Sequence, residues 1–174
     1  MSDDYSLTRA LEHRGLSIMF VPESLTLSYV ETDFEGLLEF TSRQILITRV
    51  YSNKMWRAAA LTHFLYCSTL VLGFYLILTT LFAGRPAFQL VLLTFLPLLL
   101  GSIRGVLRLT GVSEALPAVR SQIMAQAWIY VLLTLFVPFL YVVNFVHSLI
   151  TRKIRWRGAV YELISPQQTK IIRN

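Results

Sequence analysis

The sequence has a single cysteine, Cys67, and it lacks the short motifs that mark many soluble enzymes. With one thiol, no disulfide forms within the chain and a metal site built from cysteines is excluded. None of the patterns G-x-x-x-x-G-K-[ST], G-x-G-x-x-G, H-E-x-x-H or G-x-S-x-G occurs. Their absence disfavours ATPases, dehydrogenases, zinc proteases and hydrolases of those types. The N-terminus is acidic and has no apolar stretch of the signal-peptide kind.

Charge is missing from long parts of the sequence. Residues 58–82 contain no charged side chain, and a helix of that length, roughly 37 Å, crosses the ~30 Å hydrocarbon core of a bilayer when it is tilted. Two further apolar segments follow at 86–103 and 123–150, the latter with Pro138 inside. These segments predict a mainly α-helical membrane protein in which two to three transmembrane helices follow a small α/β head.

Acidic residues are scarce in the second part of the chain. Residues 1–57 hold eight acids and six bases, whereas residues 58–174 hold two acids and ten bases. The bases of the second part flank the apolar segments, as in membrane proteins whose basic loops stay in the cytoplasm. This placement explains the net charge of +6, so that no nucleic-acid partner is expected.

The same distribution divides the chain into a polar head (1–57), a transmembrane region (58–150) and a basic cytoplasmic tail (151–174). Bases on the outer flanks of the first and third apolar segments predict that both chain ends lie in the cytoplasm. The membrane is expected to be the plasma or inner membrane. Three complete crossings would separate the two ends. Either the segment 86–103, the shortest and one that contains Pro97, is re-entrant, or the charge rule fails at one end.

The first half of the head is predicted to form a helix and a strand. Ser2 can cap the helix, and Gly15 suits the left-handed conformation that ends it. Leu16-Ser17-Ile18-Met19-Phe20-Val21 is predicted to be a short strand that Pro22 stops. Residues 25–30 fit no single type of structure.

A second helix is predicted after either Thr32 or Asp33, each of which can cap it. Its apolar stripe and its polar face suit a position in the membrane interface. The stripe consists of Phe34, Leu37, Leu38, Thr41 and Ile45. A loop is expected over 104–120, and the tail is expected to be a basic run followed by a short pair of strands.

Two adjacent carboxylates, Asp3 and Asp4, fall in the first turn of the predicted first helix. Carboxylates favour the free N–H groups of a first turn, and this alone accounts for them structurally. A carboxylate beside a like charge at a membrane surface can also act as a general base toward a hydroxyl group. Asp4, preceded by Asp3, is therefore the candidate catalytic residue.

Basic and polar residues of the second helix are candidates for phosphate binding. Arg43 and Gln44 either form a solvated surface or bind a diphosphate, whose oxygens an arginine matches bidentately. Arg49 can share this task. His63 and His147 lie near the ends of apolar segments, where an interfacial position is the simpler interpretation.

Five stretches carry a resemblance to a known family: residues 2–11 (SDDYSLTRAL), residues 14–16 (RGL), residues 20–22 (FVP), residues 38–51 (LEFTSRQILITRVY) and residues 154–163 (IRWRGAVYEL). Their order resembles the second half of the catalytic domain of processive-type family 2 glycosyltransferases. The ceramide glucosyltransferase and bacterial hopanoid-type group is the most similar branch. The head would then be a partial GT-A-like half-domain.

This resemblance implies an inverting transfer of a hexose from a nucleotide-sugar donor to a membrane lipid acceptor. Asp4 matches the position of the family's catalytic base, and Arg43 matches the first position of a (Q/R)-x-x-R-W motif that contacts the diphosphate. Leu46-Ile47 replaces the Arg-Trp of that motif, and Arg49 can compensate. A divalent metal, Mg²⁺ or Mn²⁺, is implied for the complete family enzyme, with no metal ligand expected in this chain.

The family's nucleotide-binding half, with its D-x-D motif, has no counterpart before Ser2. The expectation is therefore a C-terminal fragment or one part of a split enzyme, inactive alone, with a separate N-terminal half as its partner. The alternative is a non-enzymatic polytopic membrane protein or a partner subunit. A transporter or channel subunit is disfavoured because the apolar segments carry no acid or base to line an ion path.

Overall fold

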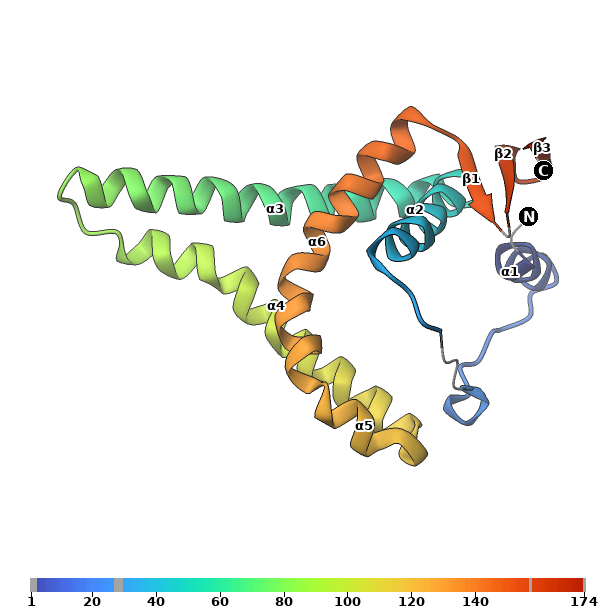
Figure 1. The fold of residues 1–174 in the computed structure, drawn as a ribbon, viewed down its shortest axis with the longest axis horizontal. Coiled ribbons are helices and arrows are strands. Elements are labelled where there is room, and N and C mark those ends of the chain that lie inside the picture. The colour runs from blue at the N-terminus through green and yellow to red at the C-terminus, as the bar shows by residue number, and fades with distance from the viewer. Residues whose placement is uncertain (1–2, 27–29, 157, 174) are drawn as a thin grey trace. The chain divides into compact units, whose positions relative to one another are not determined.

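The computed structural model describes residues 3–26, 30–156 and 158–173, and it is mainly helical (Figure 1). The elements are α1 (Asp3–His13), η1 (Pro22–Ser24), α2 (Phe34–Tyr51), α3 (Asn53–Phe82), α4 (Phe88–Ala115), η2 (Pro117–Val119), α5 (Arg120–Ala125), α6 (Ala127–Ile150), β1 (Lys153–Trp156), β2 (Ala159–Ser165) and β3 (Gln168–Arg173). Contacts divide the chain into two compact units. Unit 1 comprises Met1–Ala60 and Val143–Asn174, and unit 2 comprises Leu61–Val142.

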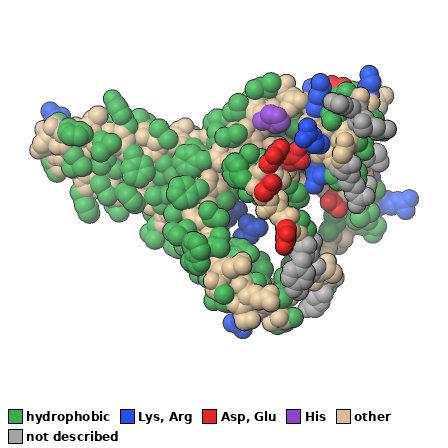
Figure 2. Space-filling model, viewed as in Figure 1, with side chains coloured by type: hydrophobic (Ala, Val, Ile, Leu, Met, Phe, Trp, Pro, Cys, Tyr) green, Lys and Arg blue, Asp and Glu red, His purple; other side chains and the backbone are tan. Residues whose placement is uncertain are grey.

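Two helices, α3 and α4, are long and apolar enough to cross a membrane. Apolar side chains cover their visible surface (Figure 2). A Cβ added at Gly73 of α3 would overlap the Thr94 side chain of α4, so that the glycine permits a close approach of the two helices. Beside this contact, Phe74 and Phe95 pack edge to face with ring centroids 5.6 Å apart. The prediction of a mainly α-helical membrane protein with a small head is confirmed.

The helix α4 is longer than predicted, because it continues to Ala115 where a loop was expected from position 104 onward. Gly105, Leu109 and Ser113 are buried at a spacing of four residues, which gives the extension a packed face at helical periodicity. Arginine side chains on such an extension reach polar surroundings through their long apolar stems. The expected loop is therefore wrong over this part of the chain.

The third apolar segment forms a bent helix. The axes of Ala127–Leu133 and Leu135–Ile150 within α6 differ by 52°. Pro138 accounts for the bend, since a proline ring clashes with the carbonyl group four residues earlier and removes one helical hydrogen bond. The segment 86–103 was expected to be the weakest span, but from Phe88 onward it is part of a 28-residue helix.

Unit 1 brings the two ends of the chain together. The Arg155 side chain of β1, which follows α6, lies 3.2 Å from the Glu39 carboxylate of α2, which precedes α3. If α3 and α4 both cross a membrane, we expect the two ends to lie on one side of it, and the number of complete crossings between them is then even. With α3 and α4 as the two crossings, we expect α6 to enter and leave at one face.

The first helix ends as its sequence predicts. Gly15 has a φ of 65°, and the N–H groups of Gly15 and Leu16 donate to the carbonyls of Glu12 and Leu11 over 3.0 Å. These two bonds form a Schellman motif, which satisfies the last carbonyls of the helix. The predicted cap Ser2 lies outside the described residues.

The predicted strand at 16–21 is wrong. The segment carries no strand assignment, and no other strand of the described residues pairs with it. Met19 and Phe20 are 81% and 73% exposed. A strand is stabilised by hydrogen bonds to a neighbouring strand, so strand-forming side chains alone do not produce one.

The tail forms a three-stranded antiparallel sheet in the order β1-β2-β3, rather than the expected pair of strands. The additional strand, β1, is the basic run itself. Its Lys153 and Trp156 lie opposite Glu162 and Ala159 of β2. Successive side chains of a strand point to opposite faces, so the basic residues of β1 alternate with apolar ones such as Ile154.

Cysteine labelling tests the sidedness of the chain. In a Cys67→Ser background, single cysteines replace one of the exposed residues His13, Arg85, Ala118 and Gln168. A membrane-impermeant thiol reagent should reach positions 13, 118 and 168 from one face and position 85 from the other. Labelling of position 118 on the same face as position 85 would show instead that α6 crosses completely.

Candidate functional site

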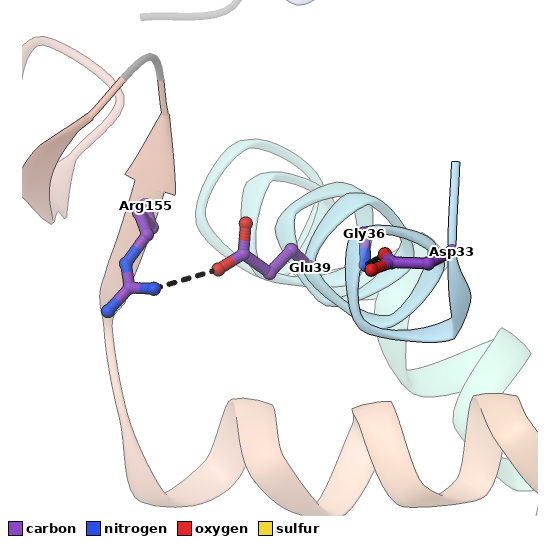
Figure 3. A network of polar contacts seen from close by, with 4 residues as sticks. All are labelled: Asp33, Gly36, Glu39 and Arg155. Atoms are coloured by element: carbon purple, nitrogen blue, oxygen red, sulfur yellow. Dashed lines mark hydrogen bonds and ion pairs between the residues drawn. The ribbon is translucent and has the colours of Figure 1, made fainter. Parts of the chain in front are cut away.

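The helix α2 carries several of the candidate site residues. Its N-cap is Asp33, one of the two predicted caps, whose side chain accepts a hydrogen bond of 2.8 Å from the Gly36 N–H (Figure 3). Such a cap stabilises a helix by about 1 kcal/mol. Thr41, Ile45, Leu46 and Tyr51 are buried. The buried face therefore lies further along the helix than the predicted stripe, and Phe34 at the start of that stripe is 68% exposed.

A buried carboxamide on α6 holds α2 in place. The Asn144 side chain, 1% exposed, donates to the Thr41 hydroxyl over 2.8 Å. Its oxygen accepts from the Ser42 hydroxyl, also over 2.8 Å. Burial of an amide is costly unless its groups are hydrogen-bonded, and both ends of this one are.

A second cluster anchors the C-terminal end of α2. The Arg49 guanidinium donates to the Ser148 carbonyl and lies over the Trp56 ring at 5.7 Å from the centroid. The Trp56 indole N–H donates to the Ser148 hydroxyl over 3.2 Å and packs edge to face on Phe145. Arg49 is thus engaged by the end of α6.

Two open grooves lie between α2 and the tail strand β1. The smaller has a volume of about 250 Å³, and its polar lining includes Glu35, Glu39, Arg43, His147, Lys153 and Arg155. The larger, about 670 Å³, is lined by Leu37, Phe40 and Trp156 among others. Glu39, Arg43 and Arg155 line both grooves. Acidic and basic side chains gather on this part of the surface (Figure 2).

An ion pair joins the two walls of the grooves. Arg155 of β1 points toward α2 and donates to the Glu39 carboxylate over 3.2 Å (Figure 3). The two side chains are 64% and 44% exposed, and exposed pairs contribute little to stability. On α2, the Arg43 guanidinium lies over the Phe40 ring, 5.5 Å from its centroid. This contact favours a position of the Arg43 guanidinium over the face of the ring.

The candidate base, Asp4, is exposed at the start of α1, directly after Asp3. Its neighbour Tyr5 holds this helix on the C-terminal half of α2. The Tyr5 hydroxyl lies 3.1 Å from the Thr48 hydroxyl, and its ring stacks on Tyr51 with centroids 5.5 Å apart.

The structure brings only part of the predicted site together. Arg43 lines both grooves, whereas Asp4, Gln44 and Arg49 line neither. The anchor Thr48 is five residues beyond Arg43, which is roughly 7.5 Å along a helix axis. Gln44 is exposed, and its carbonyl accepts from the Thr48 hydroxyl. The roles assigned to these residues stay predictions.

Sequence reasoning did not connect Glu39, Lys153 and Arg155 with Arg43. Glu39 and Arg155 are 116 positions apart, and the basic run around Arg155 has a sufficient explanation in membrane topology. The only available signal was that Glu39 and Arg43 are four residues apart and share a helix face. His147, expected at the membrane interface, lines the smaller groove.

Within the described ranges, no three His, Cys, Asp or Glu side chains lie close enough together to hold a metal ion. The described residues therefore do not fit the divalent metal implied by the resemblance, and none of them is assigned to it.

The family model of glycosyl transferase family 21 matches residues 1–169, almost the whole chain. The chain belongs to glycosyltransferase family 21. No curated protein and no solved structure matches it. The resemblance seen in the sequence is therefore confirmed at the level of a glycosyltransferase, and the family is family 21 rather than family 2.

The anchoring role of Asn144 can be measured as stability. Replacement by alanine leaves the Thr41 and Ser42 hydroxyls without this partner, and we expect the free energy of unfolding to fall by about 1–3 kcal/mol. Unfolding of the detergent-solubilised chain followed by circular dichroism gives the difference. Gln89→Ala, at an exposed position of α4, is the control and should change stability by less than about 0.5 kcal/mol. Equal effects of the two variants would contradict the anchoring role.

Proposed function

We propose that this family 21 glycosyltransferase transfers a hexose from a nucleotide-sugar to the hydroxyl group of a membrane lipid, as the ceramide glucosyltransferase-like resemblance implies. The observation that carries the proposal is the pair of grooves between α2 and β1, with Arg43 on the wall that they share. The same chain has two helices long and apolar enough to cross a membrane, which suits an acceptor whose hydroxyl group lies at headgroup depth. An arginine in such a groove suits the negative charge of a leaving diphosphate.

In the proposed reaction, the Asp4 carboxylate removes the proton of the acceptor hydroxyl. The resulting oxygen attacks the anomeric carbon from the side opposite the diphosphate, so that configuration inverts. The bond between the anomeric carbon and the diphosphate oxygen breaks, and the diphosphate leaves with the bonding electrons. Proton removal by a positioned base contributes about 10²–10⁴-fold to rate. Asp4 is exposed, and no hydrogen bond or ion pair joins its side chain to another described residue.

We place the protein in the plasma or inner membrane with unit 1 in the cytoplasm. The bases that flank α3 on its unit 1 side, including Lys54 and Arg57, and the basic run of the tail both favour this orientation. Nucleotide-sugars are made in the cytoplasm of most cells, so the donor would reach the grooves directly.

We further propose that a separate polypeptide half completes the enzyme and supplies the remaining donor-binding groups. The segment 16–21 supports this, because it carries large apolar side chains that are exposed, such as Ile18 at 60% and Phe20 at 73%. No backbone hydrogen bond joins residues 17–20 to other described residues, and strand-forming residues in this state are suited to addition of a neighbouring strand.

Replacement of the candidate base tests the reaction. In membranes from cells that lack the gene, wild-type protein should restore transfer of labelled hexose into the organic lipid extract. Asp4→Asn should restore ~10²-fold less or lower still, because the amide cannot accept the hydroxyl proton. Glu12→Gln, an exposed acid on the same helix, is the matched control and should restore normal transfer. Full restoration by Asp4→Asn, or label found only in the aqueous phase, would contradict the proposal.

The need for a second half makes a separate prediction. The purified 174-residue chain, reconstituted in lipid and supplied with nucleotide-sugars, should show no transfer or donor hydrolysis above background. The measurement is release of the nucleoside diphosphate, with and without added Mn²⁺ or Mg²⁺. Clear turnover that Asp4→Asn abolishes would show that this chain is sufficient.

A further inference from the structure

We propose that Lys153 and Arg155 of strand β1 join Arg43 of α2 in one binding site for a phosphate-bearing anion, and that Glu39 competes with this anion for Arg155. The inference rests on the proposed function, in which the nucleoside diphosphate is that anion. It adds the tail of the chain to the site, although the tail was expected only to orient the protein in the membrane.

The geometry of the smaller groove supports a phosphate site. Arg43, Lys153 and Arg155 all line it, so bases from two segments of the chain face a common space. Its volume of about 250 Å³ is many times the space that one water molecule needs. A diphosphate group is smaller than this. Two guanidinium groups and one ammonium group provide a fork-shaped donor set and a point charge for its oxygens.

Glu39 occupies Arg155 in the absence of an anion and would have to release it when an anion binds. Glu39 already holds Arg155 at 3.2 Å, so this guanidinium is directed into the space between α2 and β1 (Figure 3). The pair is partly exposed and therefore weak. A diphosphate carries more charge than one carboxylate and accepts bidentate hydrogen bonds, so it can replace Glu39 as the partner of Arg155.

Arg155, rather than Arg49, is thus the second arginine of the site. Arg49 donates to the Ser148 carbonyl and stacks on Trp56, and it lines neither groove. Arg43, by contrast, lies over Phe40 at the wall shared with Arg155. The two arginines approach the space from different elements, and so they can bind different oxygens of one anion.

Paired substitutions give an unambiguous signature. The full chain in phosphatidylcholine nanodiscs is titrated with inorganic pyrophosphate by calorimetry. Arg155→Gln should weaken binding ~10-fold, because a charge-assisted contact is lost, and Arg155→Lys should recover part of it. Glu39→Gln should strengthen binding by about 3- to 10-fold, since it removes a like charge and releases Arg155. Lys170→Gln, at an exposed position of β3 outside both grooves, is the control and should leave the affinity unchanged.

The opposite signs are decisive. If the Glu39–Arg155 pair only stabilised the fold, both variants would shift affinity in the same direction, and that result would overturn the proposal. So would an affinity that neither variant changes. Binding is measured without turnover. A negative binding result would therefore leave the proposal of Asp4-dependent transfer untouched, and a negative transfer result would leave the proposed anion site untouched.

The phosphate can come from a nucleotide or from a lipid headgroup, and a second titration separates the two. Nanodiscs that contain 30% phosphatidylglycerol should leave pyrophosphate binding unchanged if the site takes the free diphosphate. If the headgroup is the ligand, phosphatidylglycerol should compete, weakening pyrophosphate binding in the wild type and much less in Arg155→Gln. Competition by phosphatidylglycerol would show that an anionic lipid occupies the site, and it would overturn the proposal that the site binds the diphosphate of the donor.

Discussion

The buried carboxamide of Asn144 is the contact on which the arrangement of unit 1 depends. It is 1% exposed, it is bonded at both ends to hydroxyls of α2, and it lies near the end of α6. A buried amide tolerates only the register that satisfies both of its polar ends. Because β1 begins three residues after α6 ends, this register also sets which residues of the tail strand face α2. The ion pair between Glu39 and Arg155 and both grooves lie between the two elements that this contact helps to align.

The candidate site is therefore assembled from segments that lie at the two ends of the chain, with the membrane region between them. The helix α2 contributes Glu39 and Arg43, and β1 contributes Lys153 and Arg155. Membership of glycosyltransferase family 21 gives this arrangement a chemical context, because a transferase of this kind acts on a sugar donor and an acceptor. The diphosphate of the proposed donor would be the anion that this site binds.

Membrane topology shows where sequence patterns reach their limit. Hydropathy located all three apolar segments, and short length together with Pro97 made 86–103 the weakest of them. In the structure that segment is part of the 28-residue α4, because Gly105, Leu109 and Ser113 extend its packed face. The bend falls instead in α6, near Pro138. The strand predicted over 16–21 failed for a related reason, since its side chains favour a strand but no described strand lies beside it.

The sequence by itself determined most of the helices, the end of the first one at Gly15 and the class of protein. Local effects can be predicted from the sequence, because they depend on neighbouring backbone groups or on the solvent. Examples are the cap Asp33, the left-handed Gly15 and the uncharged stretch at 58–82. The order of the motifs likewise indicated a glycosyltransferase. Only the tertiary structure decided that Arg49 anchors α6 whereas Arg43 faces a groove, and that Arg155 lies opposite Glu39. These relations join residues about 100 positions apart, and no periodicity or spacing records which distant side chains will share a space.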